Sequence, residues 1–302
     1  MYDIIIIGAG PAGLTAAIYA RRALKKILIL EAKTYGGQII NTMEIENYPV
    51  APHISGVEFA TKLYQQATDL GAEIIYEKVI NLNDHGDFKE VITPQNTYTG
   101  KAVIIATGSD NRKLGLPNET DLVGKGISYC ATCDGAFYKG KTVAVVGGGN
   151  AAIEDALYLA NIAAKVYLIH RRDQLNGEEV TISRLKTQKN IELIFNSHVT
   201  QLIANQHLEQ IQIMHHDGSS RTLDVSGLFI AVGRIPENQN FAKIIHLDQF
   251  GYIQAGEDCR TNVNGIFAAG DNRVKTVRQL VTATGDGAVA ATHAIQYLSK
   301  LK

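Results

Sequence analysis

Two stretches of the sequence decide the fold. Residues 3–31 read DIIIIGAGPAGLTAAIYARRALKKILILE, and residues 142–170 read TVAVVGGGNAAIEDALYLANIAAKVYLIH. They align without a gap, and the corresponding pairs are Gly8 and Gly147, Gly10 and Gly149, Gly13 and Ala152, and Glu31 and His170. In each stretch, an apolar run typical of a strand buried on both faces leads through a glycine turn into an alanine-rich helix and a second apolar strand. This order predicts two βαβ units with right-handed crossovers.

The glycines of the first stretch have separate expected roles. Gly8 makes the tight turn, Gly10 lets the backbone approach a pyrophosphate, and Gly13 lets helix and strand pack closely. The phosphates would rest on the free N–H groups at the helix N-terminus. A single motif of this kind is weak evidence, because it also occurs as an ordinary turn. Two copies, each between a buried strand and a helix, favour a nucleotide-binding site in each unit.

A second pair of motifs supports an internal duplication. Residues 103–108 read VIIATG and residues 228–233 read LFIAVG, and each run ends in a glycine where backbone could approach a cofactor. Residues 259–271, CRTNVNGIFAAGD, and a helical pattern over 282–298 form a tail too short for a third domain. The sequence therefore predicts an α/β protein with two Rossmann-like, three-layer nucleotide-binding domains. The first is discontinuous, with residues 1–112 and 238–302, and the second comprises residues 113–237.

The residues after the second strand of each unit distinguish the cofactors. Glu31 could accept hydrogen bonds from both ribose hydroxyls and would repel a 2′-phosphate, which suits FAD or NAD. The equivalent position begins the run His170, Arg171 and Arg172, which suits a 2′-phosphate. The alternative is a solvated basic face, but the register with Glu31 argues against it. We expect FAD in the first domain and NADP in the second.

The chain has three cysteines, Cys130, Cys133 and Cys259. They are too few for a secreted disulfide framework, and a zinc site, which needs about four ligands, is disfavoured. Thiols at Cys130 and Cys133 can close a disulfide if a turn or a first helical turn lies there, and we interpret them as a redox pair rather than as unrelated buried thiols. Asp134 is a candidate proton donor or acceptor for thiol exchange, or alternatively a helix cap. Cys259 is expected in the core.

Composition excludes several other classes of function. The 302 residues carry a formal net charge of −1, so nothing suggests a nucleic acid or an acidic lipid surface as partner. The apolar run over residues 4–20 could pass for a signal peptide, but no basic residue precedes it and glycines interrupt it. No stretch reaches the roughly 20 apolar residues of a membrane helix. We expect a soluble, cytoplasmic chain.

At this point the motifs carry a family resemblance. They are GAGPAG (8–13), YGGQI (35–39), IENYP (45–49), SYCATCDG (128–135), GGGNAA (147–152), HRR (170–172), AAGD (268–271) and RQLVTA (278–283). In this order they resemble the low-molecular-weight bacterial thioredoxin reductases over essentially the whole chain. The resemblance implies an FAD-dependent homodimer that passes electrons from NADPH to a thioredoxin-like protein disulfide. It also implies rotation of one domain against the other, with hinges near residues 110–117 and 233–240.

The resemblance and the fingerprints together give the expected site. Cys133 would face the flavin, Cys130 would attack the partner disulfide, and Asp134 would handle the proton. FAD would be bound by Gly8, Gly10, Pro11, Ala12, Gly13, Glu31, Gly36, Gly37, Gln38, Asn47, Ala106, Thr107, Gly108, Gly270, Asp271, Arg278, Gln279 and Leu280. NADPH would be bound by Gly147, Gly149, Asn150, Ala151, Ala152, His170, Arg171 and Arg172.

Two departures from the family pattern bear on the electron donor. The third arginine of the family's HRR run would fall at Asn176, and losing such a contact costs about 1.5–3 kcal/mol if nothing replaces it. Ala151 stands where the family usually has Ser or Thr. Some relatives take electrons from ferredoxin instead, although Arg171 and Arg172 argue against that here. Less favoured hypotheses are a flavin-bearing redox sensor and an electron donor to a peroxidase disulfide, which normally needs an extra N-terminal redox domain.

Overall fold

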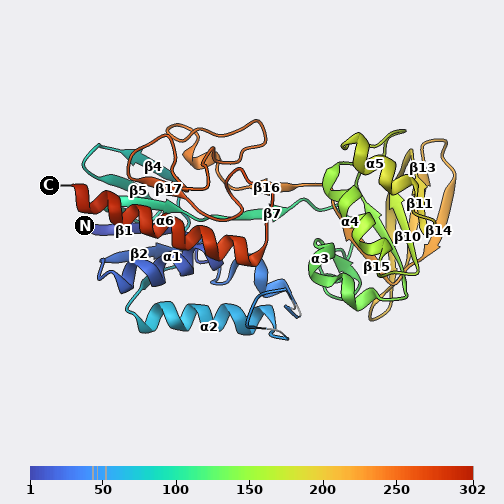
Figure 1. Ribbon diagram of the computed structural model, residues 1–302, viewed down its shortest axis with the longest axis horizontal. Coiled ribbons are helices and arrows are strands. Elements are labelled where there is room, and N and C mark those ends of the chain that lie inside the picture. Colours follow the sequence, from blue (N-terminus) through green and yellow to red (C-terminus); the bar gives the residue numbers. More distant parts are fainter. Residues whose placement is uncertain (43, 46, 52, 302) are drawn as a thin grey trace. The chain divides into compact units, whose positions relative to one another are not determined.

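A computed structural model describes residues 1–42, 44–45, 47–51 and 53–301, which fall into two compact units (Figure 1). Unit 1 comprises Met1–Asp110 and Ile235–Lys302, and unit 2 comprises Asn111–Arg234. The chain thus crosses between units at 110/111 and 234/235, whereas the boundaries predicted from the sequence are 112/113 and 237/238. At the crossings, β7 (Ser109–Asn111) and β16 (Arg234–Pro236) pair with each other.

Unit 1 is built on a seven-stranded mixed sheet. Its order is β3-β2-β1-β6-β5-β4, and β17 also pairs with β6. The strands are β1 (Tyr2–Ile7), β2 (Ile27–Leu30), β3 (Glu73–Ile75), β4 (Asn81–Asp84), β5 (Lys89–Ile92), β6 (Thr97–Ile105) and β17 (Ile266–Ala268). The N-terminal half of β6 pairs antiparallel with β5, and its C-terminal end pairs parallel with β17. The C-terminal tail therefore completes the sheet that the N-terminus began.

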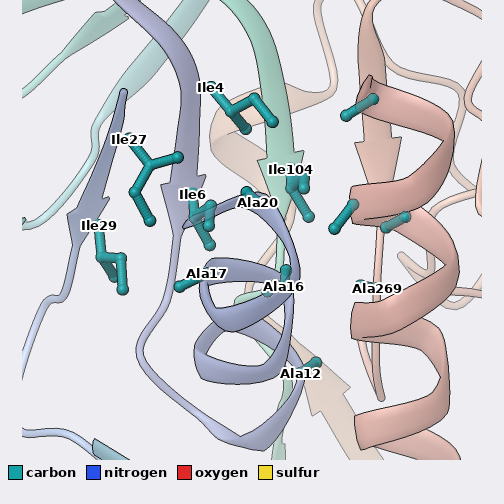
Figure 2. Packing of buried hydrophobic residues seen from close by; sticks show 14 of the residues in the cluster. Ile4, Ile6, Ala12, Ala16, Ala17, Ala20, Ile27, Ile29, Ile104 and Ala269 are labelled. Carbon is teal, nitrogen blue, oxygen red and sulfur yellow. The ribbon is translucent and has the colours of Figure 1, made fainter. Parts of the chain in front are cut away.

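Helices cover one face of this sheet. They are α1 (Pro11–Arg22), α2 (Gly56–Asp69) and α6 (Leu280–Lys300), with short 3-10 turns at Gly37–Asn41 and Gln239–Phe241. The alanines that α1 turns toward the sheet meet Ile4, Ile6 and Ile104 (Figure 2). A Cβ on Gly287 of α6 would collide with the carbonyl of Ala12, so small residues let α1 and α6 pack closely.

The opposite face of the same sheet is covered by strand and loop. Ile5, Ile7 and Leu28 alternate with the helix-facing residues and pack with Val91 of β5 and Phe241. The predicted third layer is therefore present, but here it is made of extended chain rather than of helices.

Unit 2 repeats the plan with a purely parallel sheet. Its order is β11-β10-β9-β15-β8, and a separate antiparallel sheet has the order β12-β13-β14. The elements are β8 (Ile127–Ser128), α3 (Ala131–Asp134), a 3-10 turn η2 (Gly135–Tyr138), β9 (Thr142–Val146), α4 (Asn150–Ala160), β10 (Lys165–Ile169), α5 (Glu179–Lys186), β11 (Ile191–Ile194), β12 (Ser197–Ala204), β13 (Leu208–His215), β14 (Ser220–Asp224) and β15 (Gly227–Ile230). Val143 and Val145 pack with α4, whereas Ala144 and Val146 pack with the antiparallel sheet.

The predicted fold class, two Rossmann-like α/β domains, is confirmed. The unit β1-α1-β2 has its equivalent in β9-α4-β10, and both have parallel strands. The C-terminal helix is longer than the predicted 282–298. Within the described residues, no helix has the length and apolar character needed to cross a bilayer.

Candidate active site

The glycine turn of unit 1 is fixed by close backbone contacts. Gly8 has φ +109°, and a Cβ there would overlap the carbonyl oxygen of Ala106, while a Cβ on Gly13 would overlap the carbonyl of Gly8. A Cβ on Gly10, by contrast, would meet nothing closer than the Cα of Gly37, at 3.9 Å. Gly8 and Gly13 thus serve packing, and Gly10 leaves open space beside the helix start.

Helix α1 begins without a side-chain cap. Gly10 occupies the cap position and Pro11 the first turn, so the cap residue offers no side chain to accept from the first N–H groups. Helix α2 differs, because the Ser55 hydroxyl accepts from Glu58 N. An uncapped N-terminus that opens beside Gly10 fits a pyrophosphate, which would satisfy those donors.

The other predicted FAD residues gather around this turn. Gly36 donates its N–H to the carbonyl of Ala9, at 2.8 Å, and Gly270 lies where an added Cβ would be 3.0 Å from that of Ala12. Gly108 has φ +68°, and a Cβ there would meet nothing within 4 Å. The structure therefore places three chain segments, far apart in sequence, at the N-terminus of α1.

Glu31 lies at the end of β2, as predicted, and is tied to the glycine turn. Its carboxylate accepts a hydrogen bond of 2.7 Å from Ala9 N and one of 2.8 Å from Lys33 N. These two bonds fix the orientation of a carboxylate that would face a ribose.

Three further predicted FAD residues, Gln38, Asn47 and Arg278, have polar side chains. Asn47 Nδ2 donates to Gln279 Oε1 at 3.2 Å, which links the IENYP motif to the start of α6; Glu46 of that motif lies outside the described residues. Gln38 instead donates to Asp110 at 2.6 Å. The Arg278 guanidinium lies over the ring of Tyr252, with its buried Nε unpaired among the described residues.

Thr107 and Asp271 are adjacent to a buried amide network. Asn272 Nδ2 donates to the carbonyl of Ile105 at 2.9 Å and to Thr107 Oγ1 at 3.2 Å, and Thr107 donates to Asn238. This network joins the ends of β6 and β17 and thereby positions Asp271, which lies between Gly270 and Asn272. Leu280 is the first residue of α6 in the same unit.

A buried charge cluster, which sequence reasoning missed, supports the Gly270 turn. Asp286 of α6 accepts from Gly270 N at 2.9 Å, from both Nε and Nη2 of Arg273 at 2.8 Å, and from Lys275 Nζ at 2.8 Å. Despite its burial, which raises the pKa of Asp286, these donors hold that pKa below its ordinary value. Cys259 is fully buried nearby, where desolvation raises its pKa to about 12. The predicted core role of Cys259 is confirmed.

The second glycine turn reproduces the geometry of the first. Gly147 has φ +154°, and a Cβ there would collide with the carbonyl of Ala231, the counterpart of Ala106. The same Cβ would be 2.6 Å from that of Ala152, and Gly149 caps α4 without a side-chain hydrogen bond. This uncapped helix N-terminus again fits a phosphate group.

The residues of the basic run beside this turn, His170, Arg171 and Arg172, differ in position and in charge. A Cβ on Gly148 would overlap the His170 ring, so that ring lies directly on the turn. Burial, followed by Arg172 and Arg171, lowers the pKa of His170. The positive charge at neutral pH therefore rests on the two exposed arginines rather than on all three residues.

Asn176, at the position of the missing arginine, also lies at this turn. Its N–H donates to the carbonyl of Gly148 at 2.7 Å, and the Asn150 side chain accepts from Glu178 N at 2.8 Å. Residues 176–178 are thus held beside the turn, and the Asn176 side chain is exposed there. Ala151 is exposed on the first turn of α4.

Cys130 and Cys133 form a disulfide with a Cα–Cα distance of 5.3 Å. Cys130 is the cap residue of the short helix α3, and Cys133 lies in its first turn, as the spacing predicts. Asp134 caps no helix with its side chain. Its carboxylate instead accepts a hydrogen bond of 2.6 Å from the buried hydroxyl of Ser128, a contact that the sequence did not reveal. Burial raises the pKa of Asp134, and the Ser128 bond opposes that rise.

Comparison with known proteins adds a separate line of evidence. The chain matches the family model described as pyridine nucleotide-disulphide oxidoreductase over residues 2–287. Thioredoxin reductase of Listeria innocua is 43% identical over 304 residues, spanning 100% of this chain and 95% of that protein. Thioredoxin reductase of Bacillus subtilis is 40% identical, spanning 100% and 96%. The crystal structure of thioredoxin reductase from Streptococcus pyogenes matches with a TM-score of 0.94 at 41% identity, covering 99% of this chain and 98% of that one.

Proposed function

The chain belongs to the pyridine nucleotide-disulphide oxidoreductase family, and on that premise we propose that it is an FAD-dependent enzyme that uses NADPH to reduce the disulfide of thioredoxin. The observation that carries the proposal is the coexistence of two uncapped glycine-turn sites with one Cys130–Cys133 disulfide. Nucleotide binding alone would not need the disulfide, and a simple thiol protein would not need two nucleotide sites.

Unit 1 is the proposed FAD domain. The N-terminus of α1 would hold the pyrophosphate, Glu31 the adenosine ribose, and Asp271 with the start of α6 the ribityl and ring end. FAD, when bound, would accept a hydride from the nicotinamide and supply two electrons to a disulfide. The protein's own contribution there is binding and orientation.

Unit 2 is the proposed NADPH domain. Its second glycine turn would hold the pyrophosphate, with Asn150, Ala151 and Ala152 on the first turn of α4. Arg171 and Arg172 would bind the 2′-phosphate by charge-assisted hydrogen bonds. His170, neutral and stacked on Gly148, would shape the pocket rather than add charge.

The dithiol performs the exchange with the protein substrate. Once the disulfide is reduced, Cys130 as thiolate would attack one sulfur of the partner disulfide, and the other partner sulfur would leave with a proton. Cys133 would then attack Cys130 sulfur, which releases the second partner thiol and restores the Cys130–Cys133 disulfide. Asp134 would carry the proton between the sulfurs.

A second candidate donor, ferredoxin, is favoured by one observation, the replacement of an arginine by exposed Asn176. Both arginines of the phosphate site remain, so NADPH is the preferred donor. From the relatives we also propose that the enzyme is a cytoplasmic homodimer. Sedimentation of the purified protein, which for a dimer gives twice the 32.8 kDa chain mass, tests the oligomeric state.

The test of the donor is anaerobic mixing of the purified yellow protein with NADPH and, separately, with NADH. Rapid loss of the oxidised flavin absorbance with NADPH and slow loss with NADH supports the assignment. If neither nicotinamide bleaches the flavin while a chemical reductant does, NADPH is the wrong donor. Cys130→Ser tests the exchange step, because it should abolish thioredoxin reduction and leave bleaching by NADPH intact.

A further inference from the structure

The Ser128 hydroxyl lies at the centre of the redox turn. It donates to Asp134 Oδ2 at 2.6 Å, it accepts from Cys130 N at 3.0 Å, and the carbonyl oxygen of Cys130 is 3.2 Å away. A hydroxyl has one proton, and the shorter distance together with the charged acceptor favours Asp134. A single side chain thus joins the proposed proton carrier to the backbone of the attacking cysteine.

The environment makes this contact strong. Ser128 is 2% exposed and belongs to β8, which pairs with β15 in the parallel sheet, so its hydroxyl is fixed by the core of unit 2. Cys133 and Asp134 lie on the four-residue helix α3, which Cys130 precedes as the cap residue and which has few internal bonds of its own. A short, weakly stabilised turn needs an external partner to hold one geometry.

The groups around Asp134 leave Ser128 as its main polar partner. Tyr138 of η2 is the titratable neighbour, and burial together with the Asp134 charge raises its pKa to about 12, so it stays neutral. Helix α4 packs against α3 and brings the ring of Tyr158 to Gly135. Of the acids of α4, Glu154 raises the pKa of Asp155, and neither is among the groups that shift the pKa of Asp134. Among the described residues, no lysine or arginine influences the Asp134 carboxyl.

We propose that Ser128 is a positioning residue for thiol exchange, whose buried hydroxyl holds the Asp134 carboxylate ready to pass a proton from Cys130 to the leaving sulfur. This inference rests on the proposed function. In the step concerned, the Cys130 thiol gives its proton to Asp134, its sulfur bonds to one substrate sulfur, the substrate S–S bond breaks, and the departing sulfur takes the proton. Attack by Cys133 completes oxidation of the enzyme dithiol and reduction of the substrate to two thiols.

The test uses two small disulfides and needs neither NADPH nor thioredoxin. The holoenzyme is reduced with dithiothreitol and desalted without oxygen, then mixed with hydroxyethyl disulfide, whose alkyl thiol leaves poorly without a proton. In parallel it is mixed with dithiobis(nitrobenzoate), whose aromatic thiolate leaves unaided. Cys259 does not interfere, because it is fully buried.

Ser128→Ala should slow the reaction with hydroxyethyl disulfide about tenfold or more and change that with the aromatic disulfide less than about twofold. The acid limb of the alkyl-disulfide rate should move to higher pH, because Asp134 loses the donor that favours its charged form. Ser128→Thr, which keeps the hydroxyl, should restore both. In an Asp134→Asn background, Ser128→Ala should have no further effect.

Ser197→Ala is the matched control, since Ser197 is also buried in unit 2 and its hydroxyl also bonds a backbone carbonyl and a second side chain. This control variant should change stability, but it should not change the ratio of the rates with the two disulfides. Equal slowing of both disulfides by Ser128→Ala, or an unmoved acid limb, would overturn the proposal. If Ser128→Ala does not fold, the Ser128→Thr variant decides. A ratio of the two disulfide rates in that variant that differs from the wild-type ratio contradicts the role. Failure of thioredoxin reduction by the wild type would instead reject the proposed function.

Discussion

The hydroxyl of Tyr129 donates a hydrogen bond of 2.7 Å to the buried carboxylate of Glu119. The same carboxylate accepts from three successive backbone N–H groups, those of Leu114, Gly115 and Leu116. Tyr129 precedes Cys130, and residues 114–116 follow the first crossing between units. Glu119 therefore joins the first segment of unit 2 to the redox turn.

Tyr129→Phe should destabilise unit 2 by about 1.5–3 kcal/mol, since it removes one hydrogen bond to a buried charge and keeps the ring. The measurement is hydrogen exchange at the amides of residues 114–116, because a two-unit chain need not unfold in one step. Tyr98→Phe is the control, as Tyr98 also donates to a carboxylate, that of Glu77, which is accessible to solvent. Equal protection of these amides in Tyr129→Phe and wild type would show that the contact contributes nothing.

Asp155 gives a pH prediction. Burial and then Glu154 raise its pKa to about 7, against the opposing effect of Arg234. A raised pKa means that its contribution to stability is complete below about pH 4 and is lost as pH rises through 7. Asp155→Asn should therefore raise the melting temperature relative to wild type at pH 8 and much less at pH 4. A difference that is the same at both pH values would contradict the buried-acid assignment.

The 2′-phosphate site predicts a change in coenzyme preference. Arg172→Ala should raise KM for NADPH roughly tenfold or more, from a lost charge-assisted contact, and leave KM for NADH nearly unchanged. Asn176→Arg should lower KM for NADPH, because residues 176–178 are already held beside the turn. Steady-state kinetics with both coenzymes checks this. Arg221→Ala on β14, which pairs with Glu192, is the control and should affect neither KM.

Asp286→Asn should weaken FAD binding as well as stability. It leaves buried Lys275 without its anion and buried Arg273 with the exposed Glu257 as its remaining acidic partner among the described residues, which costs about 3–5 kcal/mol. It also loosens the bond to Gly270 N. Loss of FAD on dialysis, followed by absorbance of the retained protein, measures the effect. Asp258→Asn, at an exposed ion pair with Arg260, should retain the cofactor. Full FAD retention by a folded Asp286→Asn protein would show that the cluster does not support the site.

The sequence predicted the elements whose signals are local. The strands β1 and β9 are continuous apolar runs, the turns that follow need glycine for steric reasons, and the Cys130–Cys133 spacing permits a disulfide. These features are encoded within a few residues, and duplication made the pattern visible twice.

The contacts of Ser128, Glu119 and Asp286 could not be predicted in this way. Each depends on where the chain returns in space, as when Asp286 on α6 meets Gly270 N across a turn. A serine or an acid in sequence carries no sign of its partner. The antiparallel sheet that packs on the parallel sheet of unit 2 was equally hidden, because alternating residues in β12–β14 show burial but not which sheet they will cover.

Strand β6 pairs with β1 and β5, which are synthesised early, and with β17, which is synthesised late, and this has a consequence for folding during translation. Val103–Ile105 emerge early, yet their partner β17 (Ile266–Ala268) is made only after all of unit 2. Unit 2 is a continuous segment and can fold as soon as it leaves the exit tunnel, whereas unit 1 must wait with one edge of β6 and one face of α1 uncovered. Translation from the N-terminus therefore should not produce N-terminal-first folding here. Nascent chains halted after Arg234 has cleared the exit tunnel, but before Ile266–Ala268 has, should hold a folded second unit beside an unfinished first one.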